Sequence, residues 1–112
     1  MNINILIQQI TPFYNKFKDN NISAVDQIKT MWDIGEILKE YIQMNDVAPH
    51  TLYRAVYGKS EGTENIIQKS YITREFLGRC YRVRNIFSTK DQITREFPNL
   101  KNFWKACMFT HI

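Results

Sequence analysis

The spacing of apolar residues predicts a chain built from helices. Near the N-terminus, apolar side chains recur every three or four residues and so share one helix face: Ile3, Leu6, Ile7, Ile10, Phe13, Tyr14 and Phe17. Pro12 interrupts this face, so we expect either a second helical piece capped by Thr11 or a kink. No segment alternates apolar and polar residues for long, which leaves room for at most a short hairpin.

The strongest pattern lies over residues 24–44. Ser23 followed by Asp26 predicts the helix start, and Asn45-Asp46 predicts its end. Its apolar stripe is unusually wide and contains Val25, Ile28, Met31, Trp32, Ile34, Gly35, Ile37, Leu38, Tyr41 and Ile42. Such a helix is central to its domain or also pairs with another chain. Gly35 costs about 1 kcal/mol against alanine in a helix, which the close approach of another helix would explain.

The remaining helices are predicted to be shorter. We expect one from Pro49 that stops at Gly58, a short one from Thr63, one from Thr73 to about Phe87, one from Ser88 to Pro98, and a last one over residues 99–112. A chain of 112 residues is expected to form one domain, residues 1–112. The predicted fold class is therefore all-α, a compact multi-helix bundle with few or no strands.

Residues 61–87 predict a helix-turn-helix-like element. A short helix, the turn Ser70-Tyr71-Ile72 and a longer basic helix follow one another in the order of that motif. On a helical wheel, the core face of the longer helix holds Phe76, Leu77, Cys80, Val83 and Phe87. The opposite side holds Arg74, Gly78, Arg79, Tyr81, Arg82 and Asn85.

These residue types suit nucleic acid. The planar guanidinium of arginine can form two hydrogen bonds with a guanine edge or a phosphate, and the asparagine amide can form hydrogen bonds with adenine or with the DNA backbone. We therefore expect Arg74, Arg79, Arg82 and Asn85 to contact the groove of duplex DNA. Lys69, Ser70 and Tyr71 would contact the phosphate backbone, and the absence of a side chain at Gly78 would let a phosphate or base edge approach.

The distribution of charge supports this interpretation. The net charge is +4, but residues 1–56 carry five basic and six acidic side chains, whereas residues 57–112 carry ten basic and five acidic ones. Glu75 is the only acid among the six charged residues from Lys69 to Arg84. The alternative is a solvated or protein-facing helix, because charged outer faces are common.

Other chemistry has little support in the sequence. His50 and His111 have no cysteine or carboxylate at metal-ligand spacing, so we expect no catalytic residue, no metal and no cofactor. Asp33, Glu36 and Glu40 share a helix side, which we interpret as a solvated face. Cys80 and Cys107 are expected to be buried, reduced thiols. Without a signal sequence or an apolar run of membrane-spanning length, the chain is expected to be cytoplasmic and not to contact a membrane.

Several short motifs resemble one protein family. They follow one another in a characteristic order: Trp32-Asp33-Ile34-Gly35, Tyr57-Gly58, Tyr71-Ile72-Thr73 with Leu77, the run 82–87, Phe97-Pro98 and the run 108–112. In this order the chain resembles the N-terminal helical domain of YhcG-like proteins, which precedes a PD-(D/E)XK nuclease domain. The sequence departs from that pattern in its Gly-Lys-Ser-Glu-Gly stretch and in lacking a nuclease core.

The resemblance implies a DNA-recognition or assembly module, either a separate protein or the N-terminal part of a longer nuclease. The end at Ile112, just after an apolar stretch, is expected for the second arrangement. The hypothesis is a non-catalytic, prokaryotic DNA-binding domain accessory to a nuclease or to a restriction or defence system. The alternative is a protein-interaction module that forms a homodimer through the helix 24–44 without contacting nucleic acid.

Overall fold

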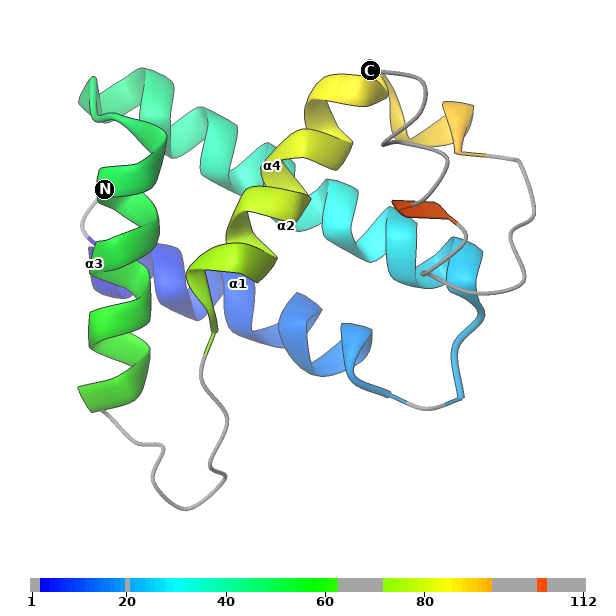
Figure 1. Ribbon diagram of the computed structural model, residues 1–112, viewed down its shortest axis with the longest axis horizontal. Helices are drawn as coiled ribbons and strands as arrows, with labels where there is room; N and C mark the ends of the chain where they lie inside the picture. Colours follow the sequence, from blue (N-terminus) through cyan, green and yellow to red (C-terminus); the bar gives the residue numbers. More distant parts are fainter. Residues whose placement is uncertain (1–2, 20, 63–71, 94–102, 105–112) are drawn as a thin grey trace.

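The computed structural model describes residues 3–19, 21–62, 72–93 and 103–104. These residues form four α-helices and one 3₁₀ turn: α1 (Ile3–Phe17), α2 (Ala24–Asn45), α3 (Pro49–Gly62), α4 (Arg74–Ile86) and η1 (Lys90–Gln92). Figure 1 shows α2 running along the length of the molecule, with α1 beside it, α4 across it and α3 upright at one end. The described part of the chain contains no strand, so the all-α multi-helix prediction is confirmed.

The two ends of α2 form as predicted. The hydroxyl of Ser23 accepts a hydrogen bond from the backbone N–H of Asp26 at 3.1 Å, which satisfies a donor in the first turn. At the other end, Asp46 adopts a left-handed conformation with φ of 51° and stops the helix. Local side-chain and backbone chemistry therefore determines where α2 begins and ends.

The wide apolar stripe of α2 is explained by packing within the chain. Helix α2 packs most extensively against α4 and α1. Ile28, Ile34 and Leu38 are fully buried in the core cluster. Even Thr30 is buried, where its hydroxyl donates to the carbonyl oxygen of Asp26 at 2.8 Å. The prediction that α2 is the central helix of the domain is confirmed.

Gly35 lies where α2 and α4 cross. A Cβ atom at this position would lie 2.2 Å from the carbonyl oxygen of Cys80 and 2.7 Å from Cβ of Arg84. Both distances are far below van der Waals contact, so the backbones touch at this point. The close helix approach predicted from Gly35 is confirmed.

Helix α1 is continuous through Pro12, so the prediction that Thr11 caps a second helical piece is wrong. Thr11 is itself helical, and its hydroxyl donates back to the carbonyl oxygen of Ile7 at 2.7 Å. Leu6 and Ile10 are completely buried on the N-terminal side of the proline. Phe13 and Phe17 pack against the same core beyond it. This shared core contact stabilises one helix across the proline.

Two predicted helix boundaries are wrong. Helix α3 continues past Gly58 to Gly62, because one glycine in an exposed helix costs only about 1 kcal/mol and does not end it. The helix predicted from Ser88 is, in the described part, the single turn η1. Gln92 accepts hydrogen bonds there from the backbone N–H groups of Ser88 at 2.8 Å and Thr89 at 3.4 Å.

Two further predicted helices fall mostly outside the described residues. These are the short helix from Thr63 and the last helix over residues 99–112, of which only Phe103 and Trp104 are described, both helical. Phe103 is buried and its ring stacks against Phe87, with 6.4 Å between ring centroids. Phe103 therefore contributes to the core beside the end of α4.

Candidate nucleic-acid interface

Helix α4 forms over the predicted residues and buries the predicted face. Thr73 caps it, with its hydroxyl accepting from the backbone N–H of Phe76 at 3.1 Å. Leu77, Cys80 and Val83 are fully buried. Burial raises the pKa of the Cys80 thiol well above its usual value, which keeps the sulfur protonated and unreactive.

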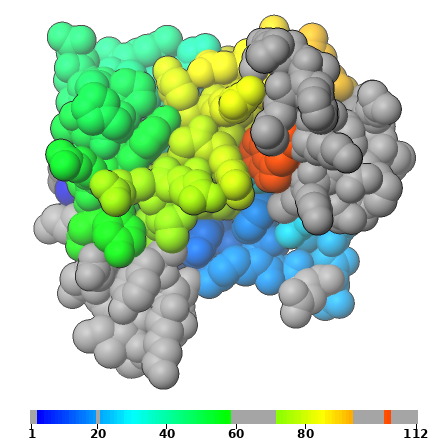
Figure 2. Space-filling model, viewed as in Figure 1, coloured from blue at the N-terminus to red at the C-terminus, as the bar shows by residue number. Residues whose placement is uncertain are grey.

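The opposite side of α4 carries the predicted contact residues. Arg74, Arg79, Arg82 and Asn85 are all exposed, and Figure 2 shows α4 and α3 side by side on one face of the molecule. Lys69, Ser70 and Tyr71 lie outside the described residues, as does most of the predicted short first helix. Of the seven predicted site residues, the structure therefore brings four together on one helix.

The contacts of Arg74 and Arg79 are weak and exposed. Arg79 pairs with Glu75 one turn earlier, with 3.0 Å between Nη2 and Oε1, and its guanidinium lies 5.3 Å from the ring centroid of Trp104. The Arg74 guanidinium lies 5.9 Å from the ring centroid of Tyr57. An exposed ion pair contributes only about 0–1 kcal/mol. Both side chains can therefore exchange these contacts for a phosphate at low cost.

Arg84 has a structural role, although it counts toward the basic excess of the sequence. It forms an ion pair with Glu36 of α2, and its guanidinium lies 4.9 Å from the ring centroid of Trp32. The indole N–H of Trp32 donates to the carbonyl oxygen of Phe87 at 2.9 Å. This cluster attaches the end of α4 to the middle of α2, and it explains why Arg84 is not part of the exposed basic face.

The acidic side of α2 differs from the solvated face that the sequence suggested. Asp33 accepts from Lys90 of η1 at 3.0 Å, and the Asp33 side chain is only 19% exposed. Glu36 is held by Arg84, whereas Glu40 is exposed. No group of three potential metal ligands occurs among the described residues. The sequence could not predict these pairs, because their partners lie about fifty residues away.

Gly78 lies beside α3, not in an open groove. A Cβ atom there would lie 3.7 Å from Cε2 of Tyr53, an ordinary van der Waals contact. Tyr53 therefore bounds the space that was predicted to admit a phosphate or base edge. The pKa of Tyr53 is raised to about 12 by desolvation, with smaller effects from Tyr81 and Cys80.

The raised pKa of Tyr53 predicts a loss of stability at high pH. Between about pH 10 and pH 12, the unfolded chain loses the phenolic proton while the folded chain keeps it, so the free energy of unfolding falls as pH rises. Chemical denaturation across this range measures the slope. We expect Tyr53→Phe to unfold with a shallower pH dependence, and an unchanged slope would contradict the assignment.

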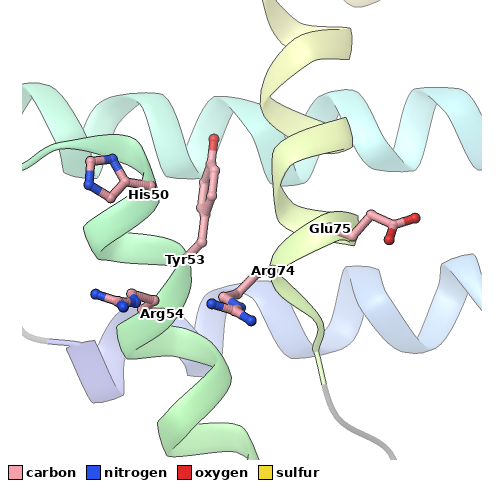
Figure 3. A pocket seen from close by; sticks show the side chains of 5 residues that line it. All are labelled: His50, Tyr53, Arg54, Arg74 and Glu75. Atoms are coloured by element: carbon pink, nitrogen blue, oxygen red, sulfur yellow. The ribbon is translucent and has the colours of Figure 1, made fainter.

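A pocket opens between α3 and the first turn of α4. Its volume is about 560 Å³, and it is lined by His50, Tyr53 and Arg54 from α3 and by Arg74 and Glu75 from α4 (Figure 3). Sequence analysis assigned no binding role to His50 or Arg54. No local signal could have done so, because only the packing of α3 on α4 places them beside Arg74.

Two of the motifs that carry the family resemblance, residues 32–35 and 82–87, meet in the structure. Trp32 and Gly35 of the first contact Arg84 and Phe87 of the second, at the crossing of α2 and α4. These motifs therefore share one structural purpose, the joining of the two helices.

Comparisons with known proteins add no assignment. No protein-family model matches the chain, and neither a curated protein nor a solved structure matches it. Among the described helices, none has the length and apolar character needed to cross a membrane. The surface of α3 and α4 is therefore the feature from which a function can be inferred.

Proposed function

We propose that the chain binds duplex DNA through the exposed side of α4. The observation that carries this proposal is the one-sided charge of the surface formed by α3 and α4. Four arginines are exposed there, Arg54, Arg74, Arg79 and Arg82. Among the described side chains of these two helices, Glu75 is the only acid, and Arg79 already pairs with it. Solvated helix faces usually mix the two signs, so this surface is suited to a polyanion.

The dimensions of α4 fit a major groove. An α-helix with its side chains is about 10–12 Å across, and the major groove is about 12 Å wide. From Arg74 to Asn85 the helix rises about 16 Å, at about 1.5 Å per residue. In the proposed complex Arg82 and Asn85 contact base edges, while Arg74 and Arg79 contact phosphates. Lys69, Ser70 and Tyr71 add backbone contacts from the segment before α4.

Fluorescence anisotropy with a labelled duplex tests this function. We expect binding at low salt, with the logarithm of the association constant falling linearly as the logarithm of salt concentration rises. Each phosphate that the protein neutralises contributes about 0.9 to this slope. As a control, the same fluorescent label attached to an uncharged polymer is titrated with the protein, which measures non-specific adsorption of the label. Failure to bind any duplex at low salt would refute the function.

The resemblance to YhcG-like proteins extends the proposal to a nuclease-accessory module. Its support is the order of short motifs in the sequence, and the reading frame beyond Ile112 tests it. A following strand-rich segment with spaced acids and a lysine would support a nuclease partner within the same protein. If no such segment or neighbouring subunit is encoded, the accessory role is wrong, although DNA binding can still be correct.

Dimerisation through α2 is the second proposal, and the structure favours it less. Its motivation was the wide apolar stripe, which α1 and α4 now account for within one chain. The exposed apolar side chain that α2 retains is Met44, which is 68% exposed near its C-terminal end. Sedimentation at micromolar concentration decides the matter, because a strict monomer excludes the homodimer.

A further inference from the structure

We infer that the pocket between α3 and α4 is a phosphate-binding site, in which Arg54 and Arg74 hold one phosphate group. This inference deepens the proposed function and rests on it for one source of the phosphate, the DNA backbone. It assigns a binding role to Arg54 and His50, two residues of α3 that precede the predicted helix-turn-helix element.

Arg74 points from α4 toward α3. Its guanidinium lies over the ring of Tyr57, which places the cation on the α3 side of its own helix. Figure 3 shows Arg74 reaching toward the turn of α3 that carries Arg54, with His50 one turn further along. Basic side chains of both helices therefore line the same pocket. The Arg54 guanidinium extends away from Arg74 in Figure 3, so this exposed side chain must turn toward α4 to share a phosphate with Arg74.

The one carboxylate of the lining is directed away from the two arginines. The carboxylate of Glu75 points away from α3 in Figure 3 and pairs with Arg79 at 3.0 Å. No described carboxylate forms an ion pair with Arg54 or Arg74. The pocket thus presents two permanent positive charges without a counterion from the described part of the chain, and an anion that sits between them lowers their mutual repulsion.

Guanidinium chemistry and the open shape favour phosphate. Each arginine can donate two parallel N–H bonds to a phosphate, and two arginines match its charge and its several oxygens. His50 supplies a further donor at the rim. The hydroxyl of Tyr53 points away from both arginines in Figure 3, so its ring forms an apolar wall. Because the pocket is open, the two ester bonds of a backbone phosphate can leave it without a clash.

The test follows the side-chain Nε–Hε signals of Arg54 and Arg74 by NMR in the full chain. One titration uses inorganic phosphate, and another uses a DNA duplex without terminal phosphates. We expect both signals to shift saturably with either probe. Arg54→Gln should remove the phosphate-induced shift at Arg74 and lower the duplex salt slope by about 0.9. Arg54→Lys should keep most of the slope and should weaken, without abolishing, the phosphate-induced Arg74 shift, because lysine keeps the charge but lacks the fork.

The matched control is Lys16→Gln, which removes one positive charge from an exposed site on α1. This variant should keep the Arg74 shift in phosphate. If phosphate moves neither arginine signal, the site is refuted, and duplex binding by the unaltered chain still decides the proposed function. If phosphate moves both signals but a bound duplex moves neither, the site takes free phosphate and its DNA contact is refuted. If phosphate binds and no duplex does, the site is supported and the proposed function is wrong.

Discussion

Replacing Gly35 by alanine is expected to lower the free energy of unfolding by about 3 kcal/mol. The new methyl group would lie 2.2 Å from the Cys80 carbonyl oxygen and 2.7 Å from Cβ of Arg84. Neither neighbour is the free end of a flexible side chain, so α2 and α4 must separate. Separation would loosen the Trp32 hydrogen bond and the Arg84–Glu36 ion pair at the same crossing. Urea denaturation followed by circular dichroism measures the loss.

Gly58→Ala is the matched control for Gly35→Ala. Gly58 is also in the interior of a helix, but no atom lies within 4 Å of an added Cβ. Alanine has the higher helix propensity, so this variant should gain up to about 1 kcal/mol. If the free energy of unfolding falls for Gly35→Ala and rises for Gly58→Ala, the helix crossing at Gly35 is the cause of the loss. Equal effects at both positions would contradict the close contact between α2 and α4.

Combined replacement of Arg74, Arg79 and Arg82 by alanine is expected to weaken duplex binding on the order of 100-fold at low salt. The same variant should lower the salt slope by about 2, because the two phosphate contacts of Arg74 and Arg79 are lost. All three residues are exposed, so the fold should persist. Anisotropy across a salt series measures both quantities.

A second triple variant separates the site from net charge. Lys16, Lys29 and Lys39 lie on α1 and α2 and not on the two helices of the proposed interface. Their replacement by glutamine reduces the formal net charge from +4 to +1, as the arginine triple does. We expect only a small loss of affinity from the lysine variant. Equal losses in the two variants would show that binding follows total charge, and the assignment to α4 would be wrong.

The predicted elements that formed as expected have their determinants close together in sequence. Ser23 and Thr73 each cap a helix by accepting from a backbone N–H three residues later. The buried face of α4 follows from helical periodicity alone, as its Leu77, Cys80 and Val83 show. Such features depend on neighbours within one or two turns, so a single segment of sequence contains the information.

The elements that were predicted wrongly depend on competition between local preference and packing. Pro12 disfavours a continuous helix, yet core contacts on both sides of it stabilise α1. Gly58 suggested a helix end, but its cost is too small without a stronger signal after it. Ser88 suggested a helix start, whereas Gln92 folds its side chain back onto the backbone of Ser88 and Thr89.

In the candidate site, too, some features could be predicted from local sequence and others depend on tertiary packing. Sequence periodicity correctly predicted that Arg74, Arg79, Arg82 and Asn85 are exposed on α4. Arg84 was not among the predicted contact residues, but its partners Glu36 and Trp32 could not be predicted, because they lie on a distant helix. Nor could sequence periodicity place Arg54 and His50 beside Arg74, since that proximity arises only when α3 packs against α4.

By itself, the sequence determined an all-helical fold, the bounds of its two best-marked helices and a surplus of basic residues in its second half. These properties arise from periodicity, caps and composition, all of which are local or additive. Only the tertiary structure decided which basic residues remain available for a ligand. That selection depends on pairs such as Arg84 with Glu36 and Lys90 with Asp33, which join residues some fifty positions apart. Long-range packing, which no local pattern encodes, brings such partners together.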